Sequence, residues 1–407
     1  VFSLLFATST FSWEQRKLVE LVDRVVRKNT NNESTLPLTI SAQYGLVDQI
    51  TYFNNRVASR DVSNYYLVLN GEFAYNKSTS DGYPFGAVKR LDLYEKGVLS
   101  TLYIVFVPKK EQQIDSDFLT VFFDTDRWHK GVAERAAEGA RNHGLLNISA
   151  EDFFDIDLSV PKDVAEQKQI GAFIRQLDNL ITLHQRKFEK LTNVKKSMLE
   201  KMFPQNGSSY PEIRFKGFTD PWEQRKLGDV VQITMGQSPD GSTYSDEPSD
   251  YILVQGNADL QNGWVCPRIW TTQITKKADA GDLIMSVRAP AGAMGKTAYN
   301  AVIGRGVAAI KGNEFIYQLL VKMDADGFWK TLSCGSTFES LNSDNIKNAE
   351  VKIPTTAEQI KIGGYFQQLD NLITLHQRKC ANLCSPSQVV FSLLFATSTF
   401  SWEQRKL

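Results

Sequence analysis

Two identical stretches far apart in the chain limit what this protein can fold into. Residues 176–187 read QLDNLITLHQRK, and residues 368–379 read the same twelve letters. The likeness extends upstream, where AEQKQIGAFIR in the first copy matches AEQIKIGGYFQ in the second. A strand-like run that ends in proline, at Pro161 or at Pro354, precedes each copy. Repetition over such a distance indicates two copies of one structural unit.

The starts of the two copies repeat as well. WEQRKL begins at Trp13 and again at Trp222, whereas the residues between these marks share little. With 407 residues, the chain is long enough for two hydrophobic cores. The repeat therefore predicts two units of about 200 residues that keep a common frame and differ in the middle.

The repeated stretches carry a heptad pattern, in which apolar residues recur at alternating spacings of three and four. Two such stripes, separated by a lobe, predict an antiparallel helix pair. Pro161 and Pro204 bracket the first helix, whose length is about 60 Å at 1.5 Å per residue, so it is interpreted as a spacer. The predicted seam consists of Ile170, Phe173, Leu177, Leu180, His184, Leu191, Ile362, Tyr365, Leu369, Leu372 and His376.

Two features of these helices allow more than one interpretation. His184 and His376 fit packed or hydrogen-bonded seam residues better than a metal or pH-sensing pair, because no carboxylate or cysteine stands at ligand spacing. The first helix, Ala165 to Phe203, carries eight basic against four acidic residues. This excess fits either a solvated face or a basic surface that meets phosphates or a partner.

The second helix departs from the first after Lys379. The chain there reads CANLCSPSQVV, and Ser385-Pro386 is expected to end the helix. Val390 to Leu407 then repeats Val1 to Leu18 without a change. This pattern suggests a joined, rearranged or frame-altered coding region.

The fold class expected for the lobes is α+β, with mixed sheets. In the second lobe, strands are predicted at Tyr251–Val254, Asp282–Val287, Val307–Ile310 and Glu350–Ile353, and a helix at Phe315–Asp324. In the first lobe, the expected elements are strands at Tyr65–Leu69 and Leu99–Val107 and a helix at Ser116–Phe123. The predicted boundaries are residues 1–160 for the first lobe, 161–204 for the central helix, 205–355 for the second lobe, 356–385 for the distal helix and 386–407 for a tail.

Loops that carry basic, amide and hydroxyl side chains are the candidate contact surfaces. Glycine lets the Gly304-Arg305-Gly306 backbone approach a surface closely, and arginine and asparagine suit purine edges in the major groove. A surface turn held by glycine and proline is the competing interpretation for each loop. The candidate residues are Asn76, Lys77, Ser78, Arg90, Arg141, Asn142, Gln237, Ser238, Arg288, Lys296, Arg305, Ser336 and Thr337.

Signals for catalysis, metals and membranes are missing from the sequence. We find no GxGxxG after a strand, no GxxxxGK[ST], no HExxH and no nucleophile elbow, so neither a catalytic site nor a bound cofactor is expected. The four cysteines form no CxxC pair, so no metal is expected, and they fit a reducing cytoplasm. No apolar stretch is long enough to span a bilayer. Formal net charge is zero, so binding to nucleic acid must depend on local charge.

The chain resembles the specificity subunits of Type I restriction–modification systems. The resemblance extends from about Trp13 to Lys379 and rests on WEQRKL at each lobe start and on the paired AEQ…LDNLITLHQRK helices. It also rests on GDLIMSVRAPAG, IGRGVAAI and GSTFESLNSDNIKNAEVKIP in the second lobe, and on GEFAYNKSTSDGYPFGAVKRL and EGARNHGLLNISAEDFF in the first.

The resemblance implies that each lobe is a target recognition domain for one half of a split double-stranded DNA site. The helices would form an antiparallel coiled coil that sets the gap between the halves. Methylation subunits, two of them, would dock and use S-adenosylmethionine, and restriction (motor-nuclease) subunits would use ATP and Mg. The chain itself would be non-catalytic and bind no cofactor.

Three alternatives remain at this point. The chain could be a rearranged or truncated product that binds partners without reading a complete site. It could be a single-chain DNA methyltransferase, although the missing cofactor loop argues against this. It could also be a coiled-coil scaffold that binds no nucleic acid.

Overall fold

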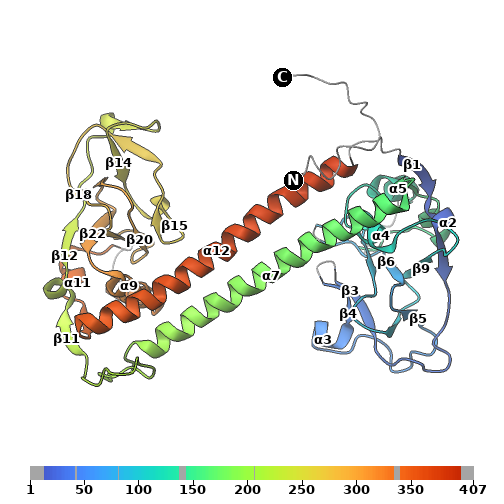
Figure 1. Ribbon diagram of the computed structural model, residues 1–407, viewed down its shortest axis with the longest axis horizontal. Coiled ribbons are helices and arrows are strands. Elements are labelled where there is room, and N and C mark those ends of the chain that lie inside the picture. Colours follow the sequence, from blue (N-terminus) through green and yellow to red (C-terminus); the bar gives the residue numbers. More distant parts are fainter. Residues whose placement is uncertain are drawn as a thin grey trace. The chain divides into compact units, whose positions relative to one another are not determined.

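The computed structural model describes residues 13–41, 44–80, 82–136, 144–205, 207–333 and 340–395, with side chains up to residue 383. The chain divides into two compact units (Figure 1). The first comprises residues 1–183 and 379–407, and the second comprises residues 184–378. Each unit boundary falls within a long helix, so each helix contributes to both units.

The first unit combines a four-stranded sheet, in the order β2-β9-β6-β7, with three two-stranded pairs, β1-β10, β3-β4 and β5-β8. Its strands are β1 (Trp13–Lys17), β2 (Val22–Val25), β3 (Leu38–Ser41), β4 (Gly45–Asp48), β5 (Tyr66–Leu69), β6 (Phe73–Asn76), β7 (Ala87–Arg90), β8 (Lys96–Leu99), β9 (Ile104–Pro108) and β10 (Asp157–Pro161). Its short helices are α2 (Leu18–Leu21), α3 (Gln49–Phe53), α4 (Ser116–Phe123), α5 (His129–Arg135) and α6 (Ala150–Phe154).

The core of the first unit is rich in aromatic rings. Tyr75 of β6 stacks on Phe153 of α6 at 4.3 Å between ring centroids and meets Trp128 edge to face. Phe118 and Phe122 bring the buried face of α4 into the same core. These aromatic side chains each bury a large apolar area, so they hold α4 and α6 against the sheet.

The second unit contains a six-stranded sheet, β12-β22-β19-β20-β16-β15, a five-stranded sheet, β13-β17-β14-β21-β18, and the pair β11-β23. Its strands are β11 (Glu223–Lys226), β12 (Gln232–Met235), β13 (Tyr244–Ser245), β14 (Tyr251–Val254), β15 (Leu260–Gln261), β16 (Trp264–Val265), β17 (Ile269–Thr271), β18 (Lys277–Ala278), β19 (Leu283–Ser286), β20 (Met294–Lys296), β21 (Ala301–Ile303), β22 (Val307–Lys311) and β23 (Glu350–Ile353). Its short helices are α8 (Leu227–Val230), α9 (Glu314–Ala325), α10 (Phe328–Leu332) and α11 (Ser343–Lys347), with 3-10 turns η1 (Gly241–Thr243) and η2 (Asn257–Asp259).

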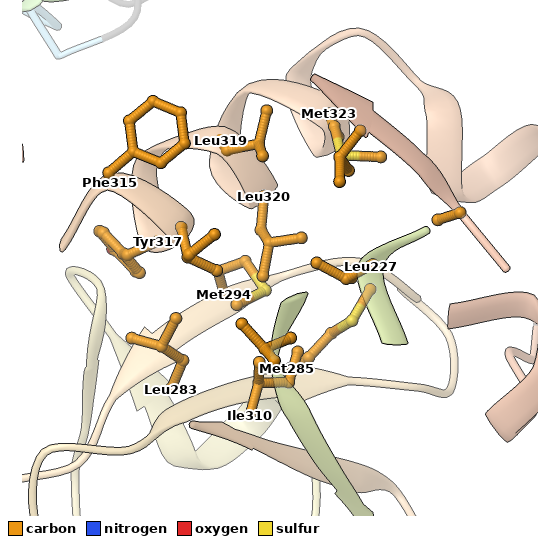
Figure 2. Close-up of a cluster of buried hydrophobic side chains, with 14 of the residues drawn as sticks. Leu227, Leu283, Met285, Met294, Ile310, Phe315, Tyr317, Leu319, Leu320 and Met323 are labelled. Carbon is orange, nitrogen blue, oxygen red and sulfur yellow. The ribbon is translucent and has the colours of Figure 1, made fainter. Parts of the chain in front are cut away.

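The core of the second unit lies between α9 and the six-stranded sheet. Figure 2 shows Leu320 of α9 pointing toward Met285 of β19 and Ile310 of β22. Asn313 begins α9 because its side chain accepts a hydrogen bond from the Ile316 amide at 3.0 Å.

The predicted common frame is present in both units. The Leu18 amide donates to the Ile156 carbonyl at 2.9 Å, and the Leu227 amide donates to the Ala349 carbonyl at the same distance. Each bond lies where a WEQRKL strand (β1 or β11) passes into a short helix beside its antiparallel partner (β10 or β23). The repeated residues therefore form the same local structure in both units. This finding agrees with the predicted α+β class.

The two long helices are α7 (Val164–Met202) and α12 (Thr356–Phe395). Asp163 accepts a hydrogen bond from the Ala165 amide at 2.8 Å and thereby caps the start of α7. Within the second unit the helices pack antiparallel. Residues further along the chain from α7 contact residues that come earlier in α12. His184 contacts His376, Lys195 forms an ion pair with Asp370, and the Phe203 ring packs against Phe366.

Three sequence predictions about these elements are wrong. Leu180 and Leu372 do not lie in a buried seam, because each is 44% exposed. Their neighbours Ile181 and Ile373 are less exposed. In a straight helix, residues seven positions apart do not fall on the same line, so the buried face moves gradually away from a strict seven-residue repeat.

The second correction is the end of α12, which continues through Pro386 to Phe395. A proline inside a helix destabilises it by about 3 kcal/mol and removes one backbone hydrogen-bond donor. Such a loss does not have to end the helix. The third is the run Leu99–Val107, which forms β8 and β9 with a turn between them. That turn is closed by a hydrogen bond from the Tyr103 amide to the Ser100 carbonyl at 3.2 Å.

Candidate nucleic-acid interface

In the second unit, three candidate loops meet through hydrogen bonds. The Gln237 amide donates to the Ile303 carbonyl at 2.8 Å. The Arg305 amide donates to the Ser238 hydroxyl at 3.1 Å. The Val287 amide donates to the Gly306 carbonyl at 2.9 Å. The loops that follow β12, β19 and β21 therefore form one surface, although they are far apart in the sequence.

Glycine is required where these loops touch. A Cβ atom on Gly236 would lie 2.1 Å from the Gly304 carbonyl oxygen, and one on Gly306 would lie 2.0 Å from the Gln255 carbonyl oxygen. Because both obstacles are backbone atoms, neither can move aside easily. The glycines therefore permit the close packing that holds Arg305 at the surface.

The side chains that this surface presents are basic or amide groups. Gln237, Arg288 and Arg305 are exposed, and Ser238 is partly buried under the Arg305 backbone. Guanidinium groups suit phosphates as well as guanine edges. The predicted residues Ser336 and Thr337 lie outside the described residues. The chain is described again from Ser340, which forms a backbone bridge with Arg288.

In the first unit, Asn76, Lys77 and Ser78 occupy the equivalent loop. The Leu146 amide donates to the Lys77 carbonyl at 3.0 Å, just as the Leu341 amide donates to the Val287 carbonyl at 2.9 Å in the second unit. The Asn76 side chain accepts from the Ser78 amide at 3.0 Å, and the Lys77 ammonium donates to the Ile148 carbonyl at 3.2 Å. Ser78 is exposed, whereas Asn76 and Lys77 are partly buried.

The predicted residues Arg141 and Asn142 also lie outside the described residues. The chain that follows them does meet the Asn76–Ser78 loop. Ser78 forms a backbone bridge with Leu145, and the Thr79 amide donates to the Gly144 carbonyl at 2.6 Å. The two candidate loops of the first unit are therefore adjacent where the structure describes them.

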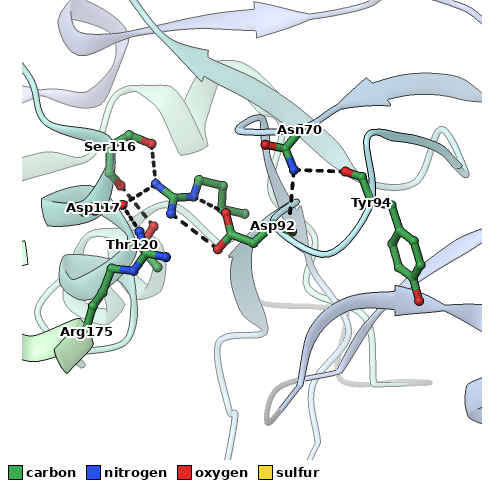
Figure 3. Close-up of polar contacts among 8 residues, drawn as sticks. Asn70, Asp92, Tyr94, Ser116, Asp117, Thr120 and Arg175 are labelled. Carbon is green, nitrogen blue, oxygen red and sulfur yellow. Dashed lines mark hydrogen bonds and ion pairs between the residues drawn. The ribbon is translucent and has the colours of Figure 1, made fainter. Parts of the chain in front are cut away.

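The proposal of a DNA contact for Arg90 is wrong for this conformation, because its side chain is 8% exposed and its guanidinium is already paired. It donates to Asp92 and Asp117 at 2.7 Å each, and to the Ser116 hydroxyl at 2.8 Å. Figure 3 shows this cluster, in which Arg175 of α7 also reaches Asp117. Arg90 thus joins β7 to the start of α4.

The Arg90 cluster also affects the acid beside it. Burial on its own raises the pKa of Asp117. Hydrogen bonds from Arg90 and Arg175 and the charges of both outweigh that effect, so the pKa of Asp117 is lowered from its ordinary value of 3.8. The carboxylate therefore stays ionised and holds both arginines.

Lys296 has a structural role as well, contrary to the sequence prediction. Its side chain is 13% exposed, and its ammonium lies 2.9 Å from the Glu314 carboxylate and over the rings of Trp264 and Tyr317. These contacts fasten β20 to the first turn of α9. Within the described residues, Arg288 and Arg305 are therefore the candidate arginines that remain exposed.

Sequence reasoning missed residues that support the loop surface. The Thr275 hydroxyl donates to the Gln237 carbonyl, and the Gly304 amide donates to the Val254 carbonyl at 2.8 Å. A single threonine or valine carries no motif, so no sequence signal marked either residue. The described residues contain no cluster of three or more metal-ligating side chains and no helix long and apolar enough to cross a membrane.

Comparison with known proteins agrees with the repeated architecture. Residues 219–383 match the family model described as the Type I restriction modification DNA specificity domain. The chain is 24% identical to the putative type I restriction enzyme MjaX specificity subunit of Methanocaldococcus jannaschii, over 94% of this chain and 92% of that protein. It is 22% identical to the MjaVIII specificity subunit of the same organism, over 84% and 83%.

A solved structure has the same fold. The S subunit of a Type I restriction–modification system from M. genitalium aligns with a TM-score of 0.62 at 14% identity, over 95% of this chain and 97% of that one. The family match in the second unit, the full-length relatives and the doubled frame agree with one another. Over most of its length the chain is similar to specificity subunits of Type I restriction–modification systems.

Proposed function

We propose that the chain recognises DNA through two separate loop surfaces, one in each unit, and so reads a target with two different halves. The observation that carries this proposal is the hydrogen bond from Leu146 to Lys77 and its counterpart from Leu341 to Val287. The same frame presents Asn-Lys-Ser at residues 76–78 and Ser-Val-Arg at residues 286–288. One scaffold with different side chains suits two surfaces that distinguish different bases.

In this proposal, cations and base contacts have separate tasks. Lysine and arginine supply affinity by releasing counterions from phosphates, and side chains at base edges supply discrimination. A good bidentate contact of arginine with guanine contributes about 1–3 kcal/mol of discrimination. Arg288 and Arg305 are the proposed readers in the second unit, with Gln237 and Ser238 beside them.

The long helices have the role of spacer and docking frame. α7 is one uninterrupted helix of 39 residues that belongs to both units. A helix of fixed rise per residue suits a constant spacing between two half-sites. We further propose that methylation subunits, two of them, and restriction subunits assemble on this chain, and that S-adenosylmethionine, ATP and Mg act on those partners. The chain itself is proposed to be non-catalytic, to bind no cofactor and to act in the cytoplasm.

The test is co-expression with the cognate methylation subunits, followed by mapping of methyladenine across the host genome. We expect one split motif with a fixed spacer. In the same complex, Arg288→Ala and Arg305→Ala should each relax one half of the motif and leave the other half intact. Arg225→Ala, which removes an exposed arginine of β11 away from the loops, is the matched control and should leave the motif unchanged.

Other results would favour the alternatives. Assembly with the methylation subunits but no defined motif would support a rearranged subunit that reads no complete site. Binding of S-adenosylmethionine by the purified chain alone would support a methyltransferase. Equal loss of both half-motifs in Arg305→Ala would assign that residue a structural role.

A further inference from the structure

Gln255 adds a further amide side chain to the loop surface of the second unit. It follows β14 directly and lies beside the Gly304-Arg305-Gly306 loop. A Cβ atom on Gly304 would lie 3.4 Å from the Gln255 Cα atom, and one on Gly306 would lie 2.0 Å from the Gln255 carbonyl oxygen. The Gln255 backbone is therefore packed against both glycines that flank Arg305.

A buried carboxylate fixes the backbone at Gln255. Asp259 is 2% exposed and accepts hydrogen bonds from the Gln255 amide at 2.7 Å and from the Gly256 amide at 3.1 Å. Its other oxygen accepts from the Arg268 guanidinium at 2.9 Å. Hydrogen bonds to a charged group are about twice as strong as those between neutral groups. Asp259 therefore holds the turn after β14 from inside the lobe.

Ser238 lies at the same junction. Its hydroxyl accepts from the Arg305 amide at 3.1 Å, and a Cβ atom on Gly304 would lie 3.3 Å from that hydroxyl oxygen. The segments after β12, β14 and β21 thus bring together Gln237, Ser238, Gln255 and Arg305. Gln255 is partly exposed, and its side-chain amide carries a donor and an acceptor. In the major groove, adenine presents the matching pair, the N7 acceptor and the N6 donor.

We infer that Gln255 is a further specificity-determining residue, which reads an adenine adjacent to the base pair that Arg305 contacts. This inference rests on the proposed function of the loop surface. Gln255 and Arg305 lie on segments packed against each other, so their side chains reach neighbouring base pairs. Glutamine suits adenine as arginine suits guanine. Asp259 is a positioning residue, because it acts on the bases only through the backbone of Gln255.

The first test is methyladenine mapping of Gln255→Ala in the complex with the cognate methylation subunits. One A·T pair should become degenerate, next to the pair that becomes degenerate in Arg305→Ala. Gln232→Ala is the matched control, since Gln232 is an exposed glutamine at the opposite end of β12 from Gly236, and it should leave the motif unchanged. An unchanged motif in Gln255→Ala, or degeneracy at a pair other than A·T, would overturn the inference.

Gln255→Glu keeps the size of the side chain, in case the alanine variant does not fold. A carboxylate has no donor for N7 of adenine, but it accepts from N4 of cytosine. The preference for adenine at this position should therefore fall, and cytosine should become tolerated. An undiminished preference for adenine in Gln255→Glu would contradict the proposed contact.

A modified base tests the contact itself. 7-Deazaadenine pairs with thymine but lacks N7, the atom that accepts from the Gln255 amide in this inference. At the assigned adenine it should weaken binding of a duplex by the wild-type complex about three- to tenfold, the contribution of one hydrogen bond. The Gln255→Ala complex should bind the normal and the modified duplex equally. The same loss in both complexes would mean that another residue contacts N7.

Asp259→Asn tests the positioning role. It keeps the size of the side chain but replaces one acceptor oxygen with a donor. The pairs read by Gln255 and Arg305 should both become degenerate, whereas the pair read by Arg288 should persist. Equal weakening at all three positions would overturn the positioning role and leave Asp259 a general structural one.

These experiments distinguish failure of the inference from failure of the proposed function. If Arg288→Ala and Arg305→Ala relax one half-motif and the Gln255 variants do not, the inference alone fails. If the wild-type complex methylates no defined split motif, the proposed function fails with it.

Discussion

The Nδ1 atoms of His184 and His376 lie 2.8 Å apart, at the same position of two identical twelve-residue stretches. One ring must donate and the other accept, so the two identical residues adopt different roles in the contact. Both side chains are partly buried on the facing sides of α7 and α12, with ring centroids 5.0 Å apart. This contact agrees with the interpretation of the two histidines as hydrogen-bonded seam residues.

The histidine pair should be measurable as a coupling energy. His184→Leu and His376→Leu each remove one partner, and the double variant removes both. We expect a coupling of about 0.5–1.5 kcal/mol in a double-mutant cycle of urea unfolding, because the hydrogen bond is partly exposed to water. The pair Leu180→Ala and Leu372→Ala, at exposed positions of the same helices, should show additive effects. Additive effects for the histidines would mean that the contact contributes nothing to stability.

The adjacent glycines of α12 should respond in opposite directions to alanine. A Cβ atom on Gly363 would lie 2.9 Å from the Phe315 amide nitrogen of α9, so Gly363→Ala should force the helix away and lower stability by about 1–3 kcal/mol. Gly364 has open space around it, so Gly364→Ala should raise stability by about 0.5–1 kcal/mol through helix propensity. Chemical denaturation of both variants checks the pair, and the same sign for both would contradict the geometry.

The Arg90 cluster should make the first unit sensitive to acid. Since the folded-state pKa of Asp117 is lowered, its contribution to stability is present above its ordinary value of 3.8 and is lost as the pH falls through the folded value. Asp117→Asn should therefore be less stable than the parent at pH 7, and the difference should shrink below pH 4. Glu33→Gln, at an exposed acid of the same unit, is the control. A pH-independent difference for Asp117→Asn would mean that ionisation is not the cause.

Substitution of Arg90 should lower stability, whereas substitution of Arg305 should alter DNA recognition. Arg90→Ala removes the nearly buried side chain that pairs with both Asp92 and Asp117. We therefore expect the unfolding free energy of the first unit to fall by about 1–3 kcal/mol. The half-motif read by the second unit should be unaffected. Arg305→Ala should leave unfolding within about 0.5 kcal/mol of the parent. Denaturation of the free chain and methyladenine mapping of the complex distinguish the two.

The repeated residues predicted the common frame because each WEQRKL strand pairs with a strand of its own unit. α7 and α12 arise from periodic apolar residues, and α4 and α9 begin close to their predicted positions at Ser116 and Phe315. It was not predictable that Ile181 rather than Leu180 would be the less exposed residue. That difference depends on how far α7 rotates against α12, and that rotation is set by packing along the whole pair.

Two related units, long helices of the same pattern and α+β lobes could all be predicted from the residues alone, because local periodicity and repetition specify these features. Which basic residues face solvent depends instead on contacts between distant segments. Arg90 and Lys296 are basic residues, as Arg288 and Arg305 are. However, Asp117 pairs with Arg90 and Glu314 pairs with Lys296, and these ion pairs keep both side chains within the fold. Those acids are distant in sequence from their partners, and a side chain's availability for DNA depends on such neighbours.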